Sequence, residues 1–303
     1  MKKILFTGGG GAGSEAIYRL LSTQYEVYFA DADIETISGV IPKDHCHQIL
    51  YADDPKFIDH LDNLCNKYSI DLVVPSVDEE LLKIVDLETP TMLPEHEYIK
   101  IMLDKFNSAK TISNANLDSP KTIKVSSFLQ GNSFSFPCII KPRKGRGSRN
   151  VKILNRADQV AAYMLLTDMQ ADDVILQELF IGQEYTVLMG ADSEKNLKLI
   201  IPVKVAIKRG ITLRAEIVNN EIVDAACRAI HKAFPARGCY NIQLILTDDG
   251  IVMPFEINPR ISTTFCMSLA YGVNPINIFY NKIDSGLEKI GSKLKRSWIN
   301  EFY

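Results

Sequence analysis

The sequence predicts a fold that is α/β at the N-terminus, with an open parallel sheet, and α+β in the remainder, with antiparallel strands. Three observations lead to this prediction. Apolar strand-like runs alternate with amphipathic helical segments through residues 1–104, as in βαβ units. The alternation breaks near Leu103-Asp104-Lys105. Beyond the break, Asp248-Asp249-Gly250 separates two apolar runs and predicts an antiparallel hairpin.

The first elements form a βαβ unit around a glycine cluster. Gly8, Gly10 and Gly13 follow a short strand, and Asp31 ends the next one, which fits the dinucleotide-binding fingerprint. One hypothesis is therefore an NAD(P)-linked oxidoreductase that uses this turn. The alternative, which we favour, is that the glycines only allow close packing of helix against strand. The expected elements are strands at 3–7, 27–30, 70–75 and 91–94 and helices at 14–21, 57–67 and 79–86.

His45-Cys46-His47 has the composition of a metal-binding tract. No second cluster completes a tetrahedral site, so a surface strand or loop is the favoured interpretation.

The region after residue 104 mixes strands and helices without a regular βαβ order. Residues 174–189 are expected to form two strands joined across Gly182, and the lysine-rich segment 289–296 a solvated helix face. The other expected strands are 122–128, 138–141, 151–154, 197–208, 242–246 and 251–257, and the helices are 108–116, 157–166, 222–233 and 262–271.

The predicted hairpin carries polar residues where a buried strand should be apolar. Alternation places Glu256, Asn258 and Arg260 on one face, with Phe255 and Ile257 on the other. If the loop has an even number of residues, Gln243 lies opposite Pro254, on the Glu256 face and roughly 7 Å from Glu256. An odd loop would turn Gln243 away. The even register would form an oxygen-ligand site suited to Mg²⁺, which takes further ligands from nucleotide phosphates.

A basic, glycine-containing loop precedes one predicted strand. Six cations lie between positions 141 and 152, around Gly145 and Gly147. Because like charges repel one another, such a density calls for an anion, and glycines let the backbone close over it. The spacing is not that of the Walker P-loop.

Composition limits the classes of function. The 303 residues are 46% hydrophobic and 23% charged, with net charge −3, which argues against a general nucleic-acid or membrane-surface binder. No run reaches about 18 apolar residues, and we read no signal peptide. The six cysteines form no Cys-x-x-Cys pair, which favours reduced thiols and a cytoplasmic location.

Taken together and in this order, the motifs resemble the ATP-grasp superfamily, in particular stand-alone proteins similar to the synthetase halves of carbamoyl-phosphate synthase and to biotin carboxylase. The resemblance covers nearly the whole chain, from the glycine cluster through Asp78-Glu79-Glu80 and the 104–105 junction to Gln243 and Glu256-x-Asn258-x-Arg260. It implies a Rossmann-like pre-ATP-grasp domain at 1–104 and a two-subdomain ATP-grasp fold at 105–303, with a lid at about 115–178.

The resemblance also implies roles for individual residues. Arg260 would steady the transferred phosphoryl group, and Lys141 would help to neutralise its charge. Position 243 is Gln where many members carry an acid, which removes one negative charge and leaves one or two metal ions as alternatives. The implied phosphate-binding residues are Lys105, Lys141, Gly145, Arg146, Gly147 and Ser148; the adenine hinge is Gln177, Glu178, Leu179 and Phe180; the ribose acid is Glu184; and the metal ligands are Gln243, Glu256 and Asn258.

The activity implied is a Mg²⁺-ATP-dependent ligase, with Mn²⁺ as an alternative ion, that activates a carboxylate as an acyl phosphate and joins it to an amine. The expected partners are small-molecule carboxylates and amines, and the resemblance allows a homodimer. Lys204, Arg209 and Arg214 are candidates to hold the substrate carboxylate. A non-catalytic ATP-binding module is a further alternative.

Overall fold

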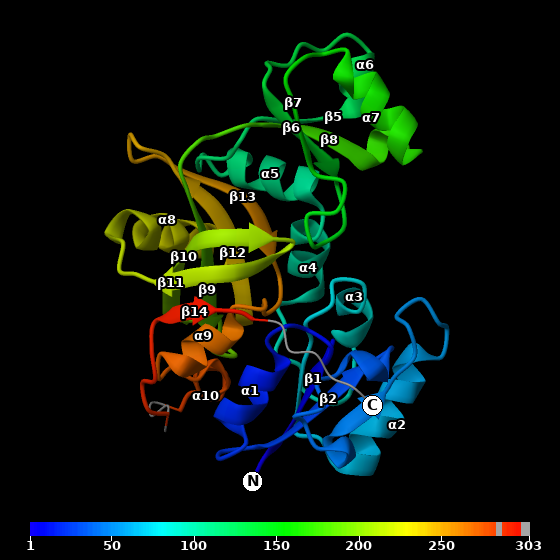
Figure 1. Cartoon of the computed structure of the whole chain (residues 1–303), viewed down its shortest axis with the longest axis vertical. Coiled ribbons are helices and arrows are strands. Elements are labelled where there is room, and N and C mark those ends of the chain that lie inside the picture. Colours follow the sequence, from blue (N-terminus) through cyan, green and yellow to red (C-terminus); the bar gives the residue numbers. More distant parts are fainter. Residues whose placement is uncertain (283–286, 298–303) are drawn as a thin grey trace.

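The computed structural model describes residues 1–282 and 287–297. Three sheets follow one another along the longest axis of the molecule (Figure 1): the N-terminal sheet at the bottom, an antiparallel sheet in the middle, and a small sheet, here called the lid sheet, at the top. The mixed α/β and α+β architecture expected from the sequence is confirmed. No helix within the described ranges has the length and apolar character needed to cross a bilayer.

The N-terminal sheet is parallel, with strand order β3-β2-β1-β4. Alternate residues of β1 feed two cores, because Ile4 and Phe6 pack with α1 and α9 while Leu5 packs with α2 and α3. Both faces are therefore covered, as parallel sheets require. The elements are β1 (Lys3–Thr7), β2 (Glu26–Asp31), β3 (Cys46–Gln48), β4 (Leu72–Val74), α1 (Ser14–Leu21), α2 (Phe57–Tyr68), α3 (Leu81–Ile84) and α4 (His96–Met102), with short 3₁₀ turns at Ile34–Thr36 and Lys43–His45.

The fourth strand of this sheet is not the one expected. Segment 91–94 makes only a single bridge, from Thr91 to Val73. Pro90 precedes the segment and Pro94 is its last residue, and neither has an N–H to donate, so the ladder does not extend. The edge on this side is β4 itself, and the fourth strand is β3, which pairs with β2 at the opposite edge and lies within the tract that includes His47.

The middle sheet is antiparallel and has strand order β13-β12-β9-β10-β11-β14. One face packs on α8, through Val223, Cys227 and Ile230, and the other faces the N-terminal part through Val203 and Ile217. The elements are β9 (Gln183–Ala191), β10 (Leu197–Arg209), β11 (Ile211–Ile217), β12 (Gly238–Leu246), β13 (Val252–Asn258), β14 (Lys293–Lys295), α5 (Lys105–Asn114), α8 (Glu221–Ala233), α9 (Phe265–Ala270) and α10 (Pro275–Phe279).

The expected helix at 289–296 is wrong, because this segment contains β14. Leu294 pairs with Ala215 of β11 and packs on the core, so the strand completes an otherwise open edge. Propensity alone does not reveal such pairing, since the partner lies far away in the sequence.

The lid sheet has strand order β5-β8-β6-β7 and is antiparallel. The strand expected at 122–128 stops after Lys124. A helix begins at Val125, whose side chain is buried in the core of the lid sheet. The elements are β5 (Thr122–Lys124), β6 (Cys138–Pro142), β7 (Lys152–Leu154), β8 (Val174–Glu178), α6 (Val125–Leu129) and α7 (Gln159–Thr167), with a 3₁₀ turn at Ala171–Asp173.

A division into domains at 1–104 and 105–303, with a lid at about 115–178, stays a proposal. Asp104 accepts hydrogen bonds from the backbone N–H groups of Phe106 and Asn107 and so caps the start of α5 at that junction. Residues 283–286 and 298–303 of the second expected domain lie outside the described residues.

Candidate functional site

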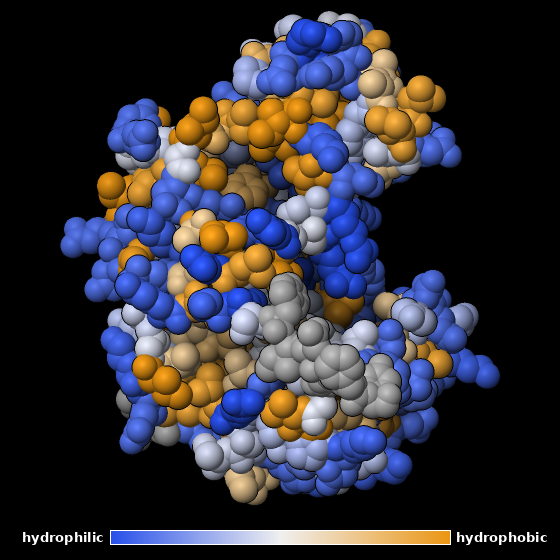
Figure 2. Space-filling view, in the orientation of Figure 1, coloured by the Kyte–Doolittle hydropathy of each residue, from blue (hydrophilic) through white to orange (hydrophobic). Residues whose placement is uncertain are grey.

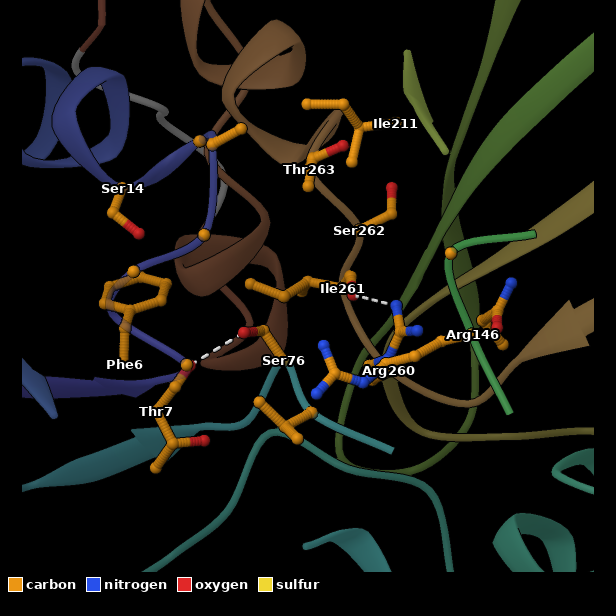
Figure 3. A pocket seen from close by; sticks show the side chains of 18 of the residues that line it. Phe6, Thr7, Ser14, Ser76, Arg146, Ile211, Arg260, Ile261, Ser262 and Thr263 are labelled. Carbon is orange, nitrogen blue, oxygen red and sulfur yellow. Dashed lines mark hydrogen bonds between the residues drawn. The ribbon is translucent and has the colours of Figure 1, made fainter. Parts of the chain in front are cut away.

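A cavity of about 940 Å³ lies where the carboxyl ends of the N-terminal strands meet the middle sheet. Figure 3 shows side chains from β1, from the loop after β4, from the basic loop and from the segment after β13 converging on this cavity. Its polar lining includes Thr7, Gly10, Asp31, Glu79, Glu80, Arg146, Lys208, Arg209, Gln243, Glu256, Asn258 and Arg260.

Three consecutive acids after β4 have three different partners. The Arg260 Nε donates to Asp78 Oδ1 at 2.5 Å, and both side chains are nearly buried. Arg146 of the basic loop pairs with the exposed Glu79 at 3.0 Å. Glu80 is 6% exposed and accepts a hydrogen bond from the Thr7 hydroxyl at 2.5 Å. Burial raises the pKa of the Glu80 carboxyl to about 7, and Asp31 and Glu79 add to the rise.

The register of the hairpin differs from the one expected. Leu244 pairs with Pro254, so near its turn the hairpin has the odd register that would send Gln243 away from Glu256. A bulge between positions 243 and 244 then restores the alignment, and Gln243 lies directly opposite Glu256 rather than diagonal to it.

The same irregularity changes the position of Phe255. Its ring was expected on the opposite face, but it lies 5.4 Å from Lys141 Nζ and 5.9 Å from Lys208 Nζ. The ring thus packs among the cations of the site, where its π face attracts them.

A chain of amide hydrogen bonds orients Asn258. Its Nδ2 donates to Asn241 Oδ1 at 3.2 Å, and Asn241 Nδ2 donates to the Arg260 carbonyl at 3.0 Å. With its nitrogen engaged by Asn241, Asn258 can offer its Oδ1 as a ligand, and both Asn258 and Glu256 line the cavity. One carboxylate and one amide oxygen are a donor set suited to Mg²⁺, which keeps waters and takes phosphate oxygens. Among the residues described, His, Cys, Asp and Glu form no group of three that could hold a metal by themselves.

Lys105 and Lys141 both lie beside the strand that carries Glu256. Lys141 Nζ donates to the Phe255 carbonyl at 3.4 Å, and Lys105 Nζ lies 4.0 Å from Glu256 Oε1. Burial lowers the pKa of the Lys141 ammonium to about 8, a shift that Glu256 opposes and Lys105 and Lys208 reinforce. Two nearly buried cations beside one carboxylate leave an excess of positive charge, which an anion would neutralise.

Lys208, on β10, was not singled out by the sequence reasoning. Its Nζ donates to Glu184 Oε1 at 2.5 Å and to Gln243 Oε1 at 2.9 Å. Strands β9, β10 and β12 each contribute one residue to this group, and the side chains of Lys208 and Glu184 are only 21% and 26% exposed. The oxygen of Gln243 that was expected to bind a metal is therefore hydrogen-bonded to an ammonium.

The basic loop extends from the lid sheet toward the N-terminal sheet. Lys105 Nζ donates to the Gly145 carbonyl at 2.7 Å, and Arg146 reaches Glu79. Gly145 and Gly147 have φ of +117° and +70°, backbone conformations that favour glycine, and Ser148 has φ of +56°. The loop is exposed, and a Cβ added at Gly145 or Gly147 would meet no atom within 4 Å. Only the backbone conformation of these two positions therefore favours glycine.

The expected adenine hinge connects the lid sheet to the middle sheet. Gln177 is buried, and its Oε1 lacks a hydrogen-bond partner within the described residues, while Glu178 accepts from the Lys121 backbone N–H at 3.2 Å. Leu179 and Phe180 are half-buried. These residues do not line the cavity of Figure 3, but Figure 2 shows the surface hollowed between the lid at the top of the view and the body below it.

The three candidates for substrate binding are dispersed. Arg209 lines the cavity, whereas Lys204 and Arg214 are exposed and do not. Asp31, the acid of the dinucleotide fingerprint, accepts hydrogen bonds from the backbone N–H groups of Gly10 and Asp33 at 2.9 and 3.0 Å. Both of its oxygens are engaged with the backbone, which does not favour binding of a nicotinamide nucleotide ribose.

A family model described as the ATP-grasp domain matches residues 102–264, more than half of the chain. The chain belongs to the ATP-grasp family. Comparison with curated protein sequences gave no match. The matched region contains Lys105, Lys141, the hinge, and the hairpin with Glu256 and Arg260, which are the residues on which the sequence resemblance rests.

Solved structures with the same fold span nearly all of this ATP-grasp chain. An N5-carboxyaminoimidazole ribonucleotide synthetase in complex with ADP has a TM-score of 0.73 and 16% identity, over 94% of this chain and 79% of the other. The Aspergillus clavatus synthase with ADP and 5-aminoimidazole ribonucleotide has a TM-score of 0.71 and 15% identity, over 95% and 77%. The biotin carboxylase domain of Hydrogenobacter thermophilus 2-oxoglutarate carboxylase, with MgADP, ADP and bicarbonate, has a TM-score of 0.65 and 12% identity, over 91% and 69%.

Sequence reasoning assigned no role to Asp78, Glu80 or Lys208, which lie at or beside this site. The pairing of Asp78 with Arg260 could have been suspected from the resemblance, which already included the acidic run. The burial of Glu80 and the partners of Lys208 gave no local signal, because an acid at a helix start and a lysine in a strand are ordinary at a surface.

Proposed function

We propose that this ATP-grasp protein is a Mg²⁺-ATP-dependent ligase that joins a carboxylate to an amine through an acyl phosphate, with release of ADP and phosphate. The observation that supports this most is that two nearly buried ammonium groups, those of Lys105 and Lys141, lie beside the single carboxylate of Glu256, which lines the cavity together with Arg260. A triphosphate supplies the missing negative charge.

The proposed reaction requires positioning and charge neutralisation rather than a covalent enzyme nucleophile. A substrate carboxylate oxygen attacks the γ-phosphorus, ADP leaves, and the amine then attacks the acyl carbon and displaces phosphate. Lys141 and Lys105 hold the phosphate oxygens, and Arg260, fixed by Asp78, presents its remaining N–H groups to the transferred phosphoryl group. Mg²⁺, when bound by Glu256 and Asn258, would neutralise phosphate charge.

The proposed nucleotide position runs from the hinge at Gln177–Phe180 to the basic loop, so that adenine lies beneath the lid sheet and the phosphates reach the cavity. The cavity itself extends beyond Arg260 to Gly10 and Glu80, and this part is the proposed position of the carboxylate and the amine. Arg209, at the same cavity, is the member of the predicted substrate-binding set that fits this position.

The decisive experiment is ADP release measured with Mg²⁺-ATP against a panel of carboxylates, including bicarbonate, each paired with amines. Carboxylate labelled with ¹⁸O should transfer one label to the released phosphate if an acyl phosphate forms. Glu256→Ala should reduce turnover by at least about 100-fold, since removal of a group that stabilises developing charge costs that much in comparable sites. Full activity of this variant, or unlabelled phosphate from the wild type, would contradict the proposal.

A thermal-shift titration separates the alternatives. Stabilisation by Mg²⁺-ATP and not by NADH is expected; the reverse would favour an oxidoreductase. Binding of ATP without turnover for any pair in the panel would favour a non-catalytic module.

A further inference from the structure

Lys208 lies beside Gln243, which the sequence reasoning predicted to be a metal ligand. Its ammonium lies between two oxygens, Glu184 Oε1 at 2.5 Å and Gln243 Oε1 at 2.9 Å, which come from neighbouring strands of the middle sheet. Short contacts of this kind between an ammonium and a carboxylate are the strong, charge-assisted hydrogen bonds. The partial burial of both ionic side chains reduces competition from water.

The only potential metal ligand of Gln243 is its neutral amide oxygen, and this oxygen already accepts a hydrogen bond from Lys208. Of the three side chains expected to bind metal, Glu256 and Asn258 fit the role, because both line the cavity and the Asn258 amide, whose nitrogen donates to Asn241, keeps its Oδ1 as a potential ligand. Gln243 does not fit, since a metal ion at its Oε1 would have to displace Lys208 and separate it from Glu184. The neutral amide at position 243 and the ammonium at position 208 both make this part of the site less favourable for a divalent cation.

The positive charge around Glu256 is already high. Lys105 lies 4.0 Å from this carboxylate, and Lys141 and Lys208 both contact the ring of Phe255, which is adjacent to it in sequence. A second divalent ion placed among three ammonium groups would be repelled by each of them, and partly buried charges are weakly screened.

We propose that the ammonium of Lys208 replaces one metal ion, so that the chain binds its nucleotide with a single divalent cation, held by Glu256 and Asn258. This inference rests on the proposed function, because it concerns the same nucleotide site. It assigns Lys208 as a positioning residue that holds Gln243 and Glu184 and presents a fixed charge to the triphosphate.

The test counts bound ions and does not depend on turnover. Mn²⁺ is titrated into the full chain with saturating AMPPNP, a non-hydrolysable ATP analogue, and free Mn²⁺ is followed by electron paramagnetic resonance. One bound Mn²⁺ per chain is expected for the wild type. In the double variant Lys208→Met Gln243→Glu, a carboxylate replaces the amide and the ammonium is gone, so a second Mn²⁺ should bind. Two ions at the spacing usual for paired metals, roughly 3.5–4 Å, would also show spin coupling in the spectrum.

The controls separate this inference from the proposed function. Lys204→Met removes an exposed lysine of the same strand, outside the cavity lining, and should leave one bound ion. Two Mn²⁺ in the wild type would overturn the inference while leaving the ligase proposal intact, and so would a folded double variant with a single ion. Failure of the wild type to bind AMPPNP by calorimetry, with or without Mn²⁺, would overturn both. The wild-type count decides the matter even if the double variant does not fold.

Discussion

Replacing Glu80 with Gln should stabilise the protein, and the gain should depend on pH. The Glu80 side chain is buried at the end of β1, where its carboxyl accepts from the Thr7 hydroxyl. Gln is isosteric and keeps an oxygen that can accept the same hydrogen bond, but it carries no charge to desolvate. The substitution thus isolates the cost of ionising this one carboxyl.

The magnitude follows from the pKa. Burial raises the pKa of Glu80 from 4.5 to about 7, which corresponds to about 3 kcal/mol at roughly 1.4 kcal/mol for each pKa unit. Below pH 4.5 the carboxyl is protonated in both the folded and the unfolded chain, so Glu and Gln should be equally stable. As pH rises through 4.5 to 7 the unfolded chain loses its proton first, and the wild type loses stability relative to the variant. The difference should reach its full value above pH 7.

The assay is urea denaturation and thermal unfolding of both proteins at pH 5, 6, 7 and 8. A difference of about 3 kcal/mol corresponds to a midpoint higher by roughly 5 °C in a chain of this length. Glu79→Gln serves as the control, because its carboxylate is about half exposed and its pair with Arg146 should contribute less than about 1 kcal/mol. A Glu80→Gln variant that is no more stable than the wild type at pH 8, or whose gain is the same at pH 5 and pH 8, would refute the reasoning.

Two further predictions concern stability around the cavity and the hinge. Asp78→Ala leaves the nearly buried Arg260 without its carboxylate and should lower the free energy of unfolding in denaturant by about 3 kcal/mol. Glu79→Ala should lower it by less than about 1 kcal/mol, and equal losses would mean that the Asp78 pair contributes no more to stability than the exposed pair. Gly182→Ala places a Cβ against the Leu246 carbonyl oxygen and 2.9 Å from the Ile245 side chain, so it should cost about 1–3 kcal/mol and weaken AMPPNP binding through the hinge. Gly291→Ala, whose added Cβ meets no atom within 4 Å, should change neither quantity, and an unchanged Gly182→Ala would show that the hinge tolerates displacement.

Several elements could be predicted because their signals are local. The helix expected at 14–21 has the same first and last residues as α1, because its helical spacing of apolar residues begins directly after the glycine turn. Gly272, with φ of +86°, ends α9, and Asn274 caps α10. The hairpin around Asp248-Asp249-Gly250 forms for the same kind of reason, because turn residues between apolar runs act over a few positions.

The errors arose where the outcome depends on distant partners. Segment 91–94 has strand composition but is limited by its flanking prolines to one bridge, and Leu294 forms an edge strand only because β11 is available to pair with it. The bulge beside Phe255 has no sequence mark that separates it from a regular strand, yet it decides which residues face Glu256.

The sequence by itself determined most of the helices and strands, the break near Asp104 and the motifs that resemble those of ATP-grasp proteins, because these depend on periodicity, turn chemistry and spacing along the chain. Only the tertiary structure decided that Asp78 pairs with Arg260 and that Lys208 engages both Glu184 and Gln243. Such pairs join residues whose separation in sequence carries no information about their distance in space. Their energies come from burial and charge, which exist only once the sheets have packed together.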